Sequence, residues 1–159
     1  MINSYIEEFL KRPDIQDMID NDNFTDVYSA CLTHLLGYLT ETLITAGIDP
    51  CLYFSDGATV PYMFFDCDDI KEYQVPDNIS FIKKDTFSFS NSLSKIILPT
   101  SIKKIDKYAF RSCDISELVY LGSKEDFKTI DLSEYAFYKS KIASIQCQDG
   151  NIDISSPYS

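Results

Sequence analysis

The chain has 159 residues, of which 45% are apolar and 22 are Phe or Tyr, enough for the core of one ordinary domain or two very small ones. It holds only five glycines, which disfavours a glycine-rich phosphate-binding loop. All of the net charge of −11 lies in residues 1–70, with 13 acidic and two basic side chains, whereas residues 71–159 hold 12 of each. This break in charge predicts two parts with different surfaces.

The first residues, MINSYIEEFL, lack the basic and apolar regions of a signal peptide, so none is expected. The apolar runs of the chain are too short to span a bilayer, and no membrane partner is expected. The five cysteines are odd in number and contain no C-x-x-C pair, a pattern typical of reduced core thiols. Together these features predict a cytoplasmic protein.

The N-terminal part, residues 1–59, is predicted to be helical. Apolar residues at helical spacing indicate short helices over residues 3–10 and 14–19, followed by a long helix over about 22–44. Gly47 and Pro50 supply the stop for that long helix.

Acidic side chains crowd the expected helix starts, where the helix dipole favours negative charge. That is the structural explanation for them. The alternative is that they form an acidic surface that binds a basic partner. The residues concerned are Asp14, Asp17, Asp20, Asp22 and Asp26.

Residues 60–152 contain a repeat. Four triplets ending in Phe64, Phe87, Phe110 and Phe137 are spaced 23, 23 and 27 residues apart. A small side chain and then an aliphatic residue follow each triplet, and further aliphatic or aromatic positions recur in register. A period of about 23 residues is typical of a solenoid, in which one unit cannot bury its own apolar face.

Each repeat unit is predicted to form a short strand with alternate residues buried, and the four Phe rings are predicted to stack as a spine. The fold class is therefore α+β: an N-terminal helical subdomain, then a short right-handed parallel β solenoid of about four units. The expected division is a helical cap at 1–59, repeats at 60–152 and a tail at 153–159.

The segment IILPTSIKKIDKYAFRSCDISEL resembles the BspA-like leucine-rich repeat, with its aliphatic-Pro-x-x-aliphatic stretch and its Ala-Phe-x-x-Cys. VYLGSKEDFKTI and IASIQCQDGNI resemble the end unit and final strand of that family. The helical opening is similar to that of repeat proteins from bacteriophages and gut bacteria. The resemblance implies a solenoid that binds macromolecules, with no shared catalytic residues.

The predicted strands present two outward columns to solvent. One alternates in sign, which fits register-setting by ion pairs; the other is apolar at its centre and polar at its ends, as in a small interface or as in ordinary surface apolarity. The first column is Glu72, Lys95, Glu117 and Ser144, and the second is Gln74, Ile97, Val119 and Gln146.

No catalytic, cofactor or metal site is predicted. His34 lies three residues after Cys31, but Cys31 falls on the expected core stripe, where a nucleophilic thiolate would be out of place. The DCDDI run at 66–70 lacks the alternating ligands and glycine of a calcium loop.

Two functions are consistent with these features. The first is a non-catalytic protein-binding module, encoded by a phage or mobile element, in which the solenoid face or the helical part recognises another protein. The alternative is an acidic, phage-encoded inhibitor that occupies the nucleic-acid channel of a basic bacterial defence enzyme, as an anti-CRISPR protein does. Direct binding to nucleic acid is not expected, because no basic patch with interleaved aromatics is evident in the sequence. The oligomeric state stays open.

Overall fold

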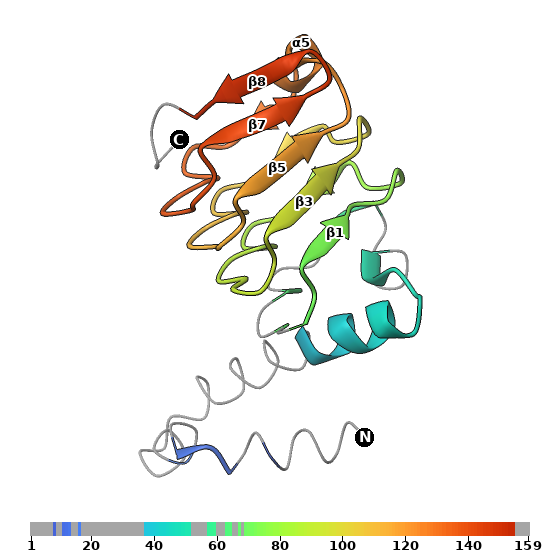
Figure 1. Cartoon of the computed structure of the whole chain (residues 1–159), viewed down its shortest axis with the longest axis vertical. Helices are drawn as coiled ribbons and strands as arrows, with labels where there is room; N and C mark the ends of the chain where they lie inside the picture. Colours follow the sequence, from blue (N-terminus) through green and yellow to red (C-terminus); the bar gives the residue numbers. More distant parts are fainter. Residues whose placement is uncertain are drawn as a thin grey trace.

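The computed structural model describes residues 8, 11–13, 16, 37–51, 57–59, 63–64, 67 and 69–154. Within them the chain folds as a parallel β solenoid that follows a helical region (Figure 1). Three solenoid turns each contribute one strand to a large sheet and one short strand to a second sheet. The predicted α+β solenoid is confirmed. The helices expected over 3–10 and 14–19, and most of the long helix, lie outside the described residues.

The large sheet carries the strands that the repeat predicts. Its order is β1-β3-β5-β7-β8, parallel except for the last pair. The predicted register is found: Tyr73, Ile96 and Leu118 pair in sequence across the strands. The strands are β1 (Glu72–Gln74), β3 (Lys95–Leu98), β5 (Glu117–Tyr120), β7 (Ser144–Cys147) and β8 (Gly150–Asp153).

A second sheet of three two-residue strands lies on the other side of three of the turns. These strands are β2 (Phe81–Ile82), β4 (Lys104–Ile105) and β6 (Asp131–Leu132). Ile82 and Ile105 are fully buried, so the repeated isoleucine columns face the core, as the repeat requires. Ala58 adds a parallel bridge to Phe81, which extends this sheet toward the N-terminus.

The phenylalanine spine is present. The rings of Phe64, Phe87, Phe110 and Phe137 stack with centroid separations of 5.5, 5.0 and 5.3 Å and interplanar angles of 16–20°. All four side chains are at most 1% exposed. Stacked rings in adjacent turns bury large apolar areas against one another, so the spine couples each turn to the next.

The helical residues 37–45 end at the predicted stop. The Ile48 N–H donates to the Leu43 carbonyl at 2.8 Å and the Gly47 N–H donates to the Ile44 carbonyl at 3.0 Å. Gly47 has φ of +79°, which glycine adopts without a steric penalty. This pattern is a Schellman cap, and it turns the chain toward β1.

At the C-terminal end, a helix and an antiparallel strand complete the solenoid. Helix α5 (Lys124–Lys128) opens with a reciprocal capping box between Ser123 and Asp126, and it buries Phe127. Strand β8 then pairs antiparallel with β7. The Phe127 ring packs edge-on against Tyr120 at 5.3 Å, which ties this end unit to the large sheet.

Ser90 occupies the small-residue column of the repeat, where Cys67 and Cys113 stand in neighbouring turns. Its side chain is fully buried, and its hydroxyl has no hydrogen-bond partner among the described residues. A buried polar group without a partner costs about 1–3 kcal/mol. A Ser90→Cys variant is therefore expected to raise the free energy of unfolding by about 1 kcal/mol in urea titrations.

Ser94→Cys is the matched control, because Ser94 is exposed and its hydroxyl already donates to the Lys71 carbonyl at 3.1 Å. This variant should leave stability unchanged or slightly reduced. A Ser90→Cys protein that is no more stable than the Ser94→Cys protein would contradict the prediction.

Candidate functional site

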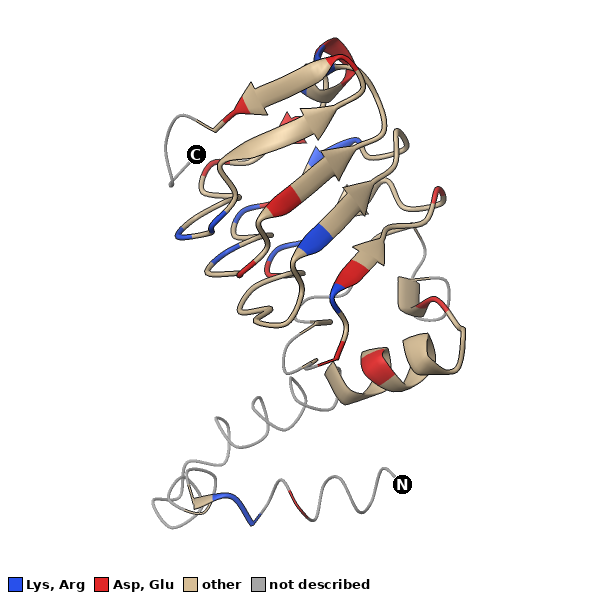
Figure 2. Ribbon diagram, in the orientation of Figure 1, with Lys and Arg blue, Asp and Glu red and all other residues tan. Residues whose placement is uncertain are grey.

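The outward face of the large sheet presents the alternating charge column. Glu72 pairs with Lys95, and Lys95 with Glu117, in the parallel register. The Lys95 ammonium lies 3.9 Å from a carboxylate oxygen of each glutamate, so one cation bridges three strands. Figure 2 shows this as a red, blue and red series at the starts of β1, β3 and β5. Such partly exposed pairs contribute little stability, so their main effect is on register.

The second column lies beside it. Gln74, Ile97, Val119 and Gln146 are consecutive partners across β1, β3, β5 and β7. Ile97 and Val119 are half-buried at the centre, and Gln74 at the edge is exposed. The structure thus places both predicted columns on one face, in the predicted order. Their role in binding stays a prediction.

A groove of about 270 Å³ adjoins this face at β1. It lies between the end of the helical residues 37–45 and the first strand, and Glu72 and Gln74 belong to both the groove and the outward columns. The exposed Ile48 side chain stands at its rim with 44% of its surface accessible. The lining residues are Ile44, Gly47, Ile48, Asp49, Glu72, Tyr73 and Gln74.

The groove was not predicted, although the AGIDP sequence after the helix marks the turn that forms it. The Asp49 side chain in this groove is hydrogen-bonded within the protein. The Tyr73 hydroxyl donates to one of its carboxylate oxygens at 2.6 Å, and the Cys51 backbone N–H donates to the same oxygen at 2.9 Å. Burial raises the pKa of Tyr73 above its ordinary value and the pKa of Cys51 to about 11. Both groups are therefore protonated at neutral pH.

The cysteines that the structure describes are all free. Cys51, Cys67 and Cys113 are buried, as predicted for core thiols, and Cys147 is half-buried. Burial raises the pKa of Cys113 to about 12, which leaves almost no thiolate near neutrality. Among the described residues no helix is long and apolar enough to cross a bilayer.

Several residues weighed in the sequence analysis fall outside the described part of the chain. These are Cys31, His34 and the five aspartates Asp14, Asp17, Asp20, Asp22 and Asp26. Of the acidic run at 66–70, the structure describes Cys67, Asp69 and Ile70. Cys67 is 2% exposed and its thiol donates to the Gly37 carbonyl, so it belongs to the core. The described residues contain no group of acidic, His or Cys side chains suited to a metal ion.

The structure also shows a cluster of cations and aromatic rings that was not evident in the sequence. On the turns that precede the large-sheet strands, cationic side chains lie over tyrosine rings. Sequence inspection missed them because they come from three different turns. We call this cluster the basic edge; it comprises Lys84, Lys107, Tyr108, Arg111, Tyr135, Tyr138 and Lys139.

Comparison with known proteins identifies one family. The family described as the BspA type leucine rich repeat region matches residues 59–158, with six copies of its repeat. No curated protein and no solved structure matches the chain. The match covers every strand of both sheets, so it supports the repeat architecture directly.

Proposed function

The chain belongs to the BspA-type leucine-rich repeat family, and from this we propose that it is a non-catalytic module that binds another protein through the outward face of the large sheet. Leucine-rich repeat domains generally serve as binding folds that mediate protein–protein interactions. We propose further that the module acts in the cytoplasm of a bacterial host cell. The partner is proposed to span the outward columns of the large sheet.

The observation that carries the proposal is the composition and order of that face. Ile97 and Val119 are adjacent at its centre, with glutamines at both ends of their column and the Glu72–Lys95–Glu117 ion pairs alongside. Interfaces commonly combine an apolar centre with a polar rim. The groove beside β1 extends the face and offers a recess in which a partner side chain can lodge.

The test introduces charge at the centre of the face. Ile97→Lys/Val119→Lys is expected to weaken partner binding at least about tenfold, because two desolvated apolar contacts are replaced by cations. Both side chains point outward, so the variant should fold normally, and its circular dichroism spectrum should match that of the wild-type chain. Binding is measured as retention of the captured partner on the immobilised full chain, followed by titration of that purified partner.

Thr100→Lys/Gln148→Lys is the matched control, since both residues are exposed and the change in net charge is the same. Loss of the partner with the first variant and retention with the control supports the proposal. Equal retention by both variants would place the interface elsewhere.

A second proposal follows from the charge of the first 70 residues. Concentrated carboxylates can imitate a phosphate backbone and occupy a basic nucleic-acid channel. An acidic inhibitor of a bacterial defence enzyme, encoded by a phage or another mobile element, is the function of this kind that we propose. The same capture experiment distinguishes this proposal from the first. Binding should be abolished when the aspartates at positions 14, 17, 20, 22 and 26 are changed to asparagine, and added salt should weaken binding steeply. Salt-resistant binding would reject this candidate.

A further inference from the structure

Charge is distributed unevenly over the solenoid. The second-sheet strands and the turns after them, residues 80–90, 103–112 and 130–141, hold eight of the 14 basic side chains and four of the 25 acidic ones. This gives them a charge of +4, while the other residues of 71–154 carry −4. Blue segments accordingly gather on the loops beside the starts of the large-sheet strands in Figure 2.

Like charges are brought together at the basic edge. Lys84 and Lys107 each follow the paired Ile82 and Ile105 by two residues, so they occupy equivalent places on adjacent turns. Their ammonium groups lie 5.8 and 4.9 Å from the centroid of the same Tyr108 ring, and the Arg111 guanidinium carbon lies 4.8 Å from it. Like charges held this close to one another repel. On the large sheet, by contrast, Lys95 lies between Glu72 and Glu117 and forms an ion pair with each of them.

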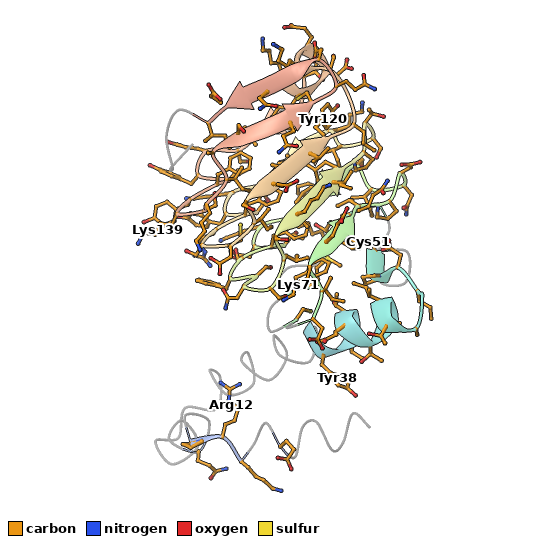
Figure 3. The ribbon with its side chains drawn as sticks, viewed as in Figure 1. Arg12, Tyr38, Cys51, Lys71, Tyr120 and Lys139 are labelled. Atoms are coloured by element: carbon orange, nitrogen blue, oxygen red, sulfur yellow. The ribbon has the colours of Figure 1, made fainter. Side chains whose placement is uncertain are left out.

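Tyrosine rings extend this positive surface. Tyr108, Tyr135 and Tyr138 contact one another with centroid separations of 5.7–6.4 Å, and all three are half-buried. Lys107 also lies 5.5 Å from the Tyr135 ring, and Lys139 lies 5.3 Å from the Tyr138 ring. Figure 3 shows Lys139 at the outer margin of the turns, away from the strands.

The lysines of this edge have no carboxylate partner within the described residues. Arg111 forms an ion pair with Asp85 at 3.0 Å, but Lys84, Lys107 and Lys139 enter no ion pair there. Cation–π contacts stabilise an exposed ammonium by about 0.5–1 kcal/mol but leave its charge uncompensated. The edge therefore combines unpaired positive charge with tyrosine and arginine, the residue types that are enriched at interface hot spots.

We propose that the basic edge is a second interaction surface, distinct from the large-sheet face, and that it binds an acidic segment of a partner protein. Carboxylates of such a segment would lie against Lys84, Lys107 and Lys139, and its apolar side chains against the tyrosines. A nucleic acid fits less well, because cations already lie over the Tyr108 ring on which a base would stack. A long polyanion would also extend beyond the patch to the rest of the solenoid, which carries a charge of −4.

The test measures binding of a labelled oligoglutamate peptide to the full chain by fluorescence anisotropy, with an oligothymidylate of equal charge as comparator. At physiological ionic strength, charges more than about 8 Å apart are largely screened, so the measured affinity depends mainly on charges close to the bound peptide. Lys84→Glu/Lys107→Glu is expected to weaken peptide binding about tenfold or more. Lys124→Glu/Lys128→Glu on α5 makes the same change in net charge elsewhere and should leave binding unchanged.

If the reversal variant fails to fold, Lys84→Gln/Lys107→Gln replaces it, with a smaller expected loss. No peptide binding by the wild-type chain, or equal loss in the α5 control, would overturn the proposal. Tighter binding of oligothymidylate would assign the edge to nucleic acid instead. Self-association in sedimentation velocity that is lost in the reversal variant would assign it to a second copy of this chain.

Discussion

Replacing Phe110 by alanine is expected to lower the free energy of unfolding by about 3–5 kcal/mol. Phe110 is fully buried in the middle of the spine, stacked 5.0 Å from Phe87 and 5.3 Å from Phe137. Truncation removes ring contacts on both sides and leaves a cavity that the rigid turns can fill only in part. Because each turn of a solenoid is stabilised by its neighbours, a gap in the middle weakens two interfaces at once.

Urea unfolding followed by circular dichroism measures this loss, and Phe89→Ala supplies the control. Phe89 is 38% exposed and lies two residues after the spine residue Phe87, with Arg111 5.1 Å from its ring. Its truncation should cost less than about 1 kcal/mol. Comparable losses for the two variants would show that the spine does not carry the stability of the solenoid.

Replacing Arg111 by alanine is expected to lower the free energy of unfolding by about 2–3 kcal/mol, because it leaves a buried carboxylate without its cationic partner. The Asp85 side chain is 9% exposed; it accepts a hydrogen bond from the Ser88 hydroxyl at 2.7 Å and pairs with Arg111 at 3.0 Å. Breaking a buried ion pair commonly costs 3–5 kcal/mol. The Arg111 side chain is 26% exposed, so water can reach part of the site and the loss should fall below that range.

A double-variant cycle identifies the cause. Asp85→Asn removes the charge but retains a residue that tolerates the left-handed backbone at this position, where φ is +61°. Asp85→Asn/Arg111→Ala should therefore be more stable than Arg111→Ala alone, as measured by urea unfolding. A double variant that is no more stable would mean that Arg111 acts through its packing on Tyr108 and Phe89.

The parts of the fold that repeat could be predicted from the sequence. Phe64, Phe87, Phe110 and Phe137 recur at nearly constant spacing, and alternation around Ile96 and Leu98 assigns Lys95 and Ile97 to the outward face. The structure places these residues as expected. Side-chain periodicity and strand pairing are coupled in a solenoid, so each predicted column carries long-range information.

The short strands of the second sheet and helix α5 could not be predicted from side-chain periodicity. The strands of the second sheet have two residues each, too few for an alternating pattern, and both residues of β6 are exposed. Helix α5 has only five residues, although the Ser123-x-x-Asp126 capping box is a signal that could have indicated its start.

The basic edge could not be found from composition, because its residues are scattered over three turns. Lys84 and Lys107 are 23 residues apart, and only the pairing of β2 with β4 brings them to one ring. The groove beside β1 likewise depends on where the Gly47 cap directs the chain. Both surfaces are products of tertiary register rather than of local sequence.

The reversed direction of β8 limits how copies of the protein can stack. A parallel solenoid ends in a row of unpaired backbone groups, onto which the first strand of another molecule could add and so propagate a fibre. Here β8 runs against β7, and its outer edge presents Asn151 and Asp153 to an incoming strand. A second molecule stacked in the same orientation would bring its first strand antiparallel to β8, and the exposed polar side chains there disfavour its addition.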